Sequence, residues 1–181
     1  MDTPRPIRVE LVPHDPAWAS LARAEADSLH AALGDGLLAV HHIGSTAIAG
    51  IRAKPIIDLM PVVRSPALLD ESRLALEGSG FRWWGELGLP GRRYCTRDDP
   101  ASGKRLVQLH LYAQGSRDIA RHLAFRDHLC REPECAREYE REKLRCQRLH
   151  PDDSHAYGDC KSDWIRGIEA QVIATHPLSM E

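Results

Sequence analysis

One acidic residue within an apolar run is the strongest sign of chemistry in this sequence. Asp58 lies inside the run IIDLM, residues 56–60, which has the length and composition of a buried strand. A buried carboxylate is costly unless it meets a cation, a metal ion or hydrogen-bond donors. Asp58 is therefore a candidate for a functional role, as a ligand to a divalent metal ion and as a catalytic residue.

A Gly-Ser-Thr turn precedes this acid in the chain. Residues 37–43 are strand-like and run directly into Gly44, Ser45 and Thr46. Glycine lets the backbone approach a ligand, and the N–H and hydroxyl groups of such a turn can hold a phosphate. The alternative is a tight turn in which Ser45 or Thr46 caps a helix. The acid downstream favours the phosphate-binding interpretation.

A histidine on a later strand is the candidate partner of Asp58. Alternation along residues 106–112 places Gln108 and His110 on a polar face that could line a cleft. Such a histidine is often only a hydrogen-bonded structural residue, but beside an acid it can bind metal or transfer a proton. Asp58, His110 and His42 would form a set that suits Zn²⁺, Mn²⁺ or Fe²⁺ better than Mg²⁺.

Basic residues near these segments are candidates for binding an anionic substrate. Two of them follow Pro90 and Gly91, where a guanidinium could grip phosphate or carboxylate through two hydrogen bonds, and alternation lets only one of the two face inward. A solvated surface position is the alternative for all four, and a further alternative for Lys54 is that it only neutralises the nearby Asp58. The four are Lys54, Arg92, Arg93 and Lys161.

A second carboxylate is available in the same loop. Glu86 is a candidate metal ligand or general base, and its alternative is a solvent-facing loop acid.

Several motifs together resemble the GrpB family of the nucleotidyltransferase-like superfamily. They are HIGSTAIAG and AKPIIDLM within residues 42–60, GELGLPGRRY at 85–94, QLHLY at 108–112, HLAFRDHL at 122–129, Trp18, and the spacing of Tyr157 and Lys161. The resemblance covers nearly the whole chain. It implies a fold in which Gly-Ser ends one strand and an Asp on the next strand faces a cleft.

The resemblance leaves the reaction open. Active nucleotidyltransferases carry two acids at positions i and i+2 of this strand, and these hold two Mg²⁺ ions. Here Met60 takes the second position, and a thioether is a poor Mg²⁺ ligand. One hypothesis is metal-dependent nucleotidyl or phosphoryl-type transfer to a small acceptor, with Mg, Mn or Zn. The alternative is a non-catalytic nucleotide- or metabolite-binding protein on a degenerate transferase fold. A metalloenzyme using histidines for unrelated chemistry is a third.

The order of predicted strands and helices around these residues indicates an α/β (α+β) fold with a mixed sheet and a helical C-terminal third. Asp15 is placed to cap the first helix, and Pro133 breaks the C-terminal helical region. The predicted strands are 7–12, 37–43, 56–63, 81–84, 92–97 and 105–112, and the predicted helices are 16–33, 66–78 and the region from 116 onward.

Composition narrows the class of protein. The chain has 181 residues, 43% of them hydrophobic, and a net charge of −2, which is typical of one domain, residues 1–181, without a basic field for nucleic acid. It has no apolar run of membrane-spanning length and no secretory leader pattern, so we expect a cytoplasmic protein whose partner is a nucleotide or another small anion. The sequence carries no signal for the oligomeric state.

The cysteines give a further expectation. There are five, without CxxC spacing, and we expect reduced thiols that pack as small core residues. Cys146, His150, His155 and Cys160 superficially resemble a structural zinc set, but the break at Pro151 makes their convergence uncertain.

Overall fold

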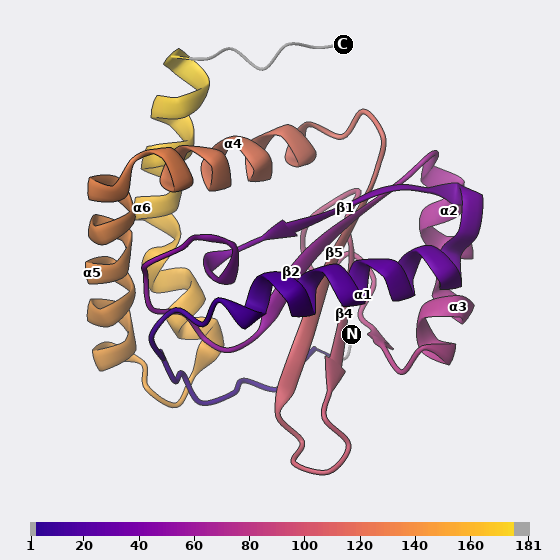
Figure 1. Ribbon diagram of the computed structural model, residues 1–181, viewed down its shortest axis with the longest axis horizontal. Coiled ribbons are helices and arrows are strands. Elements are labelled where there is room, and N and C mark those ends of the chain that lie inside the picture. Colours follow the sequence, from indigo (N-terminus) through magenta and orange to yellow (C-terminus); the bar gives the residue numbers. More distant parts are fainter. Residues whose placement is uncertain (1–2, 176–181) are drawn as a thin grey trace.

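A five-stranded mixed sheet forms the centre of the computed structural model, which describes residues 3–175 (Figure 1). The strand order is β1-β2-β5-β4-β3, in which β2 and β5 run parallel and the other neighbours run antiparallel. The predicted mixed sheet is thus confirmed. The strands are β1 (Leu37–Ile43), β2 (Ile57–Val63), β3 (Arg82–Trp83), β4 (Arg93–Asp98) and β5 (Arg105–Ala113).

One face of the sheet is covered by the helices α1 (Ala17–Leu33), α2 (Pro66–Glu71) and α3 (Arg73–Gly78). Helix α1 begins where the Ala17 N–H donates to the Asp15 carboxylate at 2.9 Å, as the sequence predicts. Its apolar stripe packs in one core cluster with the apolar face of β5. The buried residues of this cluster include Trp18, Ala22, Leu29, Val107, Leu109 and Leu111.

The opposite face meets the C-terminal helices α4 (Arg117–Arg131), α5 (Pro133–Leu149) and α6 (Ser154–Thr175). Ile119 and Leu123 of α4 pack against a buried cluster on β1, β2 and β5. In Figure 1, α5 and α6 run side by side at the left of the view and α4 crosses the upper part of α6. Because Pro133 lacks an N–H, it starts α5 rather than continuing α4. The predicted helical C-terminal third is confirmed.

Two predicted elements differ from the structure. Residues 7–12 form only an isolated bridge between Val12 and Ala53, because the Ile7 and Val9 N–H groups donate to the C-terminal segment instead, at Ser154 Oγ (3.0 Å) and the Pro151 carbonyl (2.7 Å). The single helix predicted over 66–78 is divided into α2 and α3 at Ser72. The Ser72 hydroxyl there donates to the Leu68 carbonyl at 2.6 Å, a side-chain bond that competes with regular helix.

Within residues 3–175, no helix has both the length and the apolar character that crossing a bilayer demands.

The packing of α1 predicts a contrast between two of its leucines. Leu29 is 1% exposed in the core, whereas Leu21 on the same helix is 55% exposed. Leu29→Ala should lower the free energy of unfolding by about 2–5 kcal/mol because it leaves a cavity, and Leu21→Ala should change it by about 0.5 kcal/mol. Urea unfolding of the two variants measures this, and equal losses would contradict the assigned packing.

Candidate functional site

A pocket of about 520 Å³ lies between the sheet and the C-terminal helices. Its walls come from the end of β1, from β2 and β5, from the loop before β4, and from α4, α5 and α6. The structure therefore gathers into one cavity residues that are far apart in the sequence. Eight of the predicted site residues line it: Gly44, Ser45, Thr46, Lys54, Asp58, Arg92, His110 and Lys161.

The backbone of Gly44 lies close to the side chain of Asp58 in this pocket. Ile43 pairs with Asp58 across β1 and β2, so Gly44 follows directly beside the carboxylate. A Cβ atom on Gly44 would lie 2.5 Å from Asp58 Oδ2, and Gly44 also has a φ of 71°, which side chains rarely adopt. Only glycine therefore allows the turn and Asp58 to lie this close.

His110 lies beside Asp58 on the same face of the sheet. The two are on the adjacent parallel strands β5 and β2, and His110 Nε2 lies 3.6 Å from Asp58 Oδ1. Each can offer one ligand atom to a divalent ion. Within residues 3–175, no third Asp, Glu, His or Cys completes a compact ligand group with them. A cation here would need further oxygen ligands from water or from a substrate.

His42 lies away from this pair. It is paired with Leu59, whose side chain belongs to the core on the α1 face, while the next residue, Ile43, faces the other side. His42 Nε2 lies 2.9 Å from Thr46 Oγ1, and burial lowers the pKa of the imidazole. The structure does not bring His42 to Asp58, because neighbouring residues of a strand face opposite sides.

The position two residues after Asp58 belongs to the core. Met60 is fully buried and packs with Ile43 and Tyr112 under α4. The strand position that holds a second acid in active nucleotidyltransferases thus serves packing in this chain.

Glu86 and Arg93 also lie outside the pocket. The Glu86 carboxylate accepts from the Gly91 N–H at 2.7 Å and from Arg93 at 3.4 Å, and Arg93 forms a two-point ion pair with Asp70 at 2.7 and 2.8 Å. Neither side chain is part of the pocket wall. The Glu86 carboxylate thus binds within its own loop, and the structure does not bring it to Asp58.

Arg92 faces the pocket where Arg93 does not. Its guanidinium donates to the backbone carbonyls of Glu86 and Leu87 at 3.0–3.3 Å and lies 5.1 Å from the ring centroid of Tyr94. Burial lowers the pKa of Arg92 from its usual high value, and the group stays charged at neutral pH. The prediction that only one of the two arginines faces inward agrees with this geometry.

Two lysines gather around one tyrosine. The Nζ atoms of Lys54 and Lys161 lie 5.5 and 5.3 Å from the ring centroid of Tyr157, and Lys161 Nζ is 3.3 Å from Tyr139 Oη. Burial, followed by repulsion from Lys161, lowers the pKa of Lys54 to about 8. Aromatic rings stabilise the two cations without neutralising them.

The C-terminal helices contribute pocket residues that the sequence did not predict as site residues, although His122, Phe125 and Tyr157 belong to the quoted family motifs. Arg121 of α4 pairs with Glu169 at 2.6 Å and with Asp118 at 2.9 Å. His122 is held neutral because burial, followed by the nearby His110, lowers its pKa to about 3. Only the docking of the helices brings these positions into the pocket. Besides Lys161, the other lining residues from these helices are Phe125, Tyr139, Tyr157, Gly158, Asp159 and Ile165.

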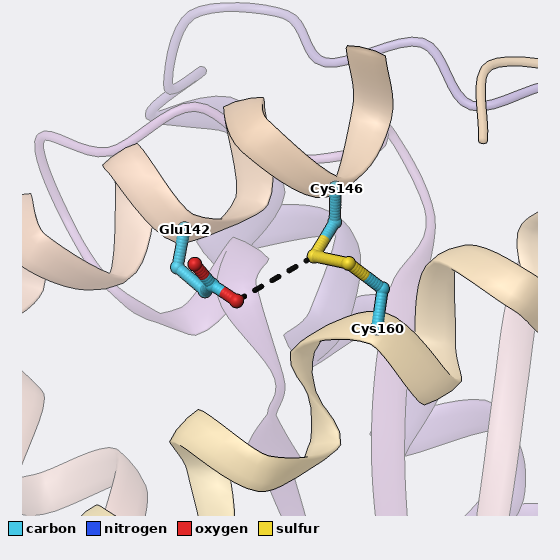
Figure 2. A group of neighbouring side chains, drawn as sticks. All are labelled: Glu142, Cys146 and Cys160. Carbon is cyan, nitrogen blue, oxygen red and sulfur yellow. Dashed lines mark hydrogen bonds between the residues drawn. A yellow bond between two sulfur atoms is a disulfide. The ribbon is translucent and has the colours of Figure 1, made fainter. Parts of the chain in front are cut away.

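The cysteines differ from expectation. Cys146 and Cys160 form a disulfide that joins α5 to α6, so reduced thiols are wrong for this pair (Figure 2). Glu142 lies beside it, with a carboxylate oxygen 3.6 Å from Cys146 Sγ. Among the described residues, His150 and His155 do not join this group, so the four residues with zinc-like spacing do not converge on one site. Cys95, Cys130 and Cys135 are free.

A family model, a solved structure and a curated sequence all match this chain over most of its length. The family described as "GrpB protein" matches residues 8–171. The crystal structure of GrpB from Enterococcus faecalis is 34% identical, with a TM-score of 0.84, and the match covers 92% of this chain and 99% of that one. The Bacillus subtilis protein YqkA is 36% identical over 162 residues, 90% of this chain but only 46% of YqkA. This chain thus spans less than half of that relative.

Two further likenesses are more distant. A dephospho-CoA kinase from Mycolicibacterium paratuberculosis is 29% identical over 180 residues, covering 87% of this chain and 44% of the kinase. The Cid1 poly(U) polymerase, in a structure with Mg 3'-dATP bound, superposes with a TM-score of 0.52 at 12% identity, over 85% of this chain and 49% of Cid1. At that identity the likeness shows the nucleotidyltransferase-like fold alone.

The contact between Gly44 and Asp58 generates a stability prediction. Gly44→Ala should lower the free energy of unfolding by at least about 1 kcal/mol more than Gly50→Ala, because the added methyl collides with the carboxylate. Gly50 is the control, with a φ of 80° but no atom within 4 Å of an added Cβ. Urea unfolding measures both. Asp58→Gly should reduce the cost of Gly44→Ala, and an equal cost in both backgrounds would refute the contact.

Proposed function

This chain belongs to the GrpB family, and on that premise we propose that its pocket binds a nucleotide or another phosphorylated small molecule. The observation that carries the proposal is the pair of lysines, Lys54 and Lys161, held over the ring of Tyr157 in a cavity that also contains Asp58. Phosphate groups of a ligand would meet these cations, and the turn at residues 44–46 would supply further donors.

The charges of the pocket favour an anionic ligand. In the part of the chain that the structure describes, no carboxylate lies within 4.0 Å of Lys54 or Lys161, although the two lysines repel each other. Arg121, in contrast, is paired with Glu169. Asp58 acts on both lysines from beyond ion-pair distance and favours the charged form of each, so two partly desolvated cations share one carboxylate. An incoming anion would stabilise this excess of positive charge, and a phosphate supplies several strong acceptors.

A single divalent cation fits beside this anion site. The Asp58 carboxylate is 25% exposed to the pocket and the His110 imidazole is within reach of it, so the two offer one oxygen and one nitrogen ligand. A bound cation would neutralise phosphate charge. The mixed ligand pair suits Mn²⁺ or Zn²⁺ better than Mg²⁺. With Met60 in the core and Glu86 in its own loop, neither of these positions offers a second carboxylate beside Asp58.

Transfer to a small acceptor is the second candidate function. The 3.6 Å approach of His110 Nε2 to Asp58 Oδ1 favours it, because a carboxylate beside an imidazole can orient it for proton transfer. In this scheme Asp58 holds the cation, His110 moves a proton, and Arg92 and the lysines bind phosphate. The solved neighbour Cid1 is a poly(U) polymerase, and its likeness in fold supports the nucleotide class.

Ligand binding tests the proposal directly. Isothermal titration with ATP, GTP, CTP, UTP and dephospho-CoA, each with Mg²⁺, Mn²⁺ or Zn²⁺, should identify a bound ligand for the wild type. Lys161→Met should weaken its binding at least about tenfold, since a charged hydrogen bond is lost. Asp58→Asn should remove the dependence of binding on the cation. Asp35 is an exposed acid outside the pocket, so Asp35→Asn should change neither the affinity nor its dependence on the cation.

Two results would count against the proposal. One is a wild type that binds none of these compounds at millimolar concentration. The other is a Lys161→Met variant that keeps full affinity. Formation of pyrophosphate in the presence of a phosphorylated acceptor would separate transfer from binding alone.

The lowered pKa of Lys54 predicts how binding depends on pH. With a pKa of about 8, Lys54 is mostly charged at pH 7 and loses its charge as the pH rises towards 9. Affinity for the phosphorylated ligand should therefore fall over this interval, by up to about tenfold. Lys54→Arg should flatten the profile because arginine stays charged. Parallel profiles for the wild type and the variant would assign the pH dependence to another group.

A further inference from the structure

A second cavity opens from the same site. It has a volume of about 240 Å³ and shares four lining residues with the large pocket. Molecules bound in the two cavities would therefore meet at a common boundary. The shared residues are Lys54, Arg92, Gln108 and His110.

The lining of this second cavity is strongly basic. Arg5, Lys54, Arg92 and Arg105 contribute side chains to it, and none of the lining residues that the structure describes is Asp or Glu. The whole chain has a net charge of −2, so its average composition does not explain this concentration of positive charge. A concave surface of one sign focuses the electrostatic field and attracts ligands of the opposite sign.

The N-terminal segment fixes the outer wall of this cavity. Ile7 and Ser154 both line it, and the Ile7 N–H donates to Ser154 Oγ at 3.0 Å. Two residues further on, the Val9 N–H donates to the Pro151 carbonyl at 2.7 Å. These bonds join residues that are more than 140 positions apart. The cavity is therefore a built feature of the fold, which explains why residues 7–12 do not join the sheet.

The cations of this cavity differ in how they are held. Arg105 is mostly buried and pairs with Asp98, so its charge is largely balanced. Arg5 is exposed, and no carboxylate of residues 3–175 forms an ion pair with it. A neighbouring hollow of about 310 Å³ adds Lys104 and Arg8, of which Arg8 pairs with Asp152 at 3.8 Å, and one acid, Glu10. Among the residues described, the cations without a close carboxylate in the second cavity are therefore Arg5, Lys54 and Arg92.

We propose that this second cavity, the basic channel, binds a small anionic ligand with a phosphate or carboxylate group beside the ligand of the large pocket. The inference rests on the proposed function and deepens it, because it names the class of the second ligand and places that ligand next to His110. Its volume suits a phosphate- or pyrophosphate-sized group, whereas the large pocket takes the nucleotide. If transfer occurs, the acceptor is an anion that enters through the basic channel.

Inorganic pyrophosphate is the probe that tests this inference. Isothermal titration of the wild type should show two binding sites. Arg5→Glu reverses a charge in the basic channel only and should weaken one site at least about tenfold. Lys161→Met alters the large pocket only and should weaken the other. Arg23→Glu, on the exposed side of α1 at the opposite face of the sheet, should leave both sites unchanged, and circular dichroism checks folding.

The outcomes separate this inference from the proposed function. An Arg5→Glu isotherm that matches the wild type would overturn the basic channel, even if Lys161→Met loses its site. Loss of a site in Arg5→Glu with no change in Lys161→Met would support the basic channel and contradict the proposed role of the large pocket.

Discussion

The approach of a glycine backbone to one carboxylate is the constraint on which the site depends. Gly44 and Asp58 lie at the end of the β1–β2 ladder, where any side chain on Gly44 would occupy the space of the carboxylate. The same contact brings the hydroxyl-bearing turn, Ser45–Ala47, to the edge of the pocket. The same contact therefore fixes both the position of the acid and the position of the candidate phosphate-binding turn.

Three cationic side chains of the pocket are held in place by neutral groups. Arg92 is held by backbone carbonyls, and Lys54 and Lys161 are held by the rings of tyrosines. Carbonyls and aromatic faces orient a cation without cancelling its charge, whereas a carboxylate would neutralise it. The pocket thus keeps its attraction for an anion. The disulfide between Cys146 and Cys160 lies one residue from Lys161 and ties this part of α6 to α5.

The acids of the site favour binding over two-metal catalysis. Asp58 remains available, but the i+2 position holds Met60, which the core requires, and Glu86 stabilises its own loop through Gly91. Of the other acids in the pocket, Glu169 forms an ion pair with Arg121. A single cation shared with ligand phosphates is consistent with this set, and the imidazole of His110 is the group that could add proton transfer.

The sequence by itself determined the parts of this protein that depend on local rules. Alternation placed His110 on the polar face of its strand, an isolated acid marked Asp58, and the adjacent arginines 92 and 93 had to face opposite ways. Periodicity and Pro133 likewise predicted the helical C-terminal third. Only the tertiary structure decided strand register, which turned His42 toward the α1 face, and helix docking, which brought Tyr157 and His122 into the pocket. It also decided that residues 7–12 bond to the C-terminal segment and that Cys146 meets Cys160. These outcomes depend on contacts between distant segments, and a local pattern carries no information about which of them will meet.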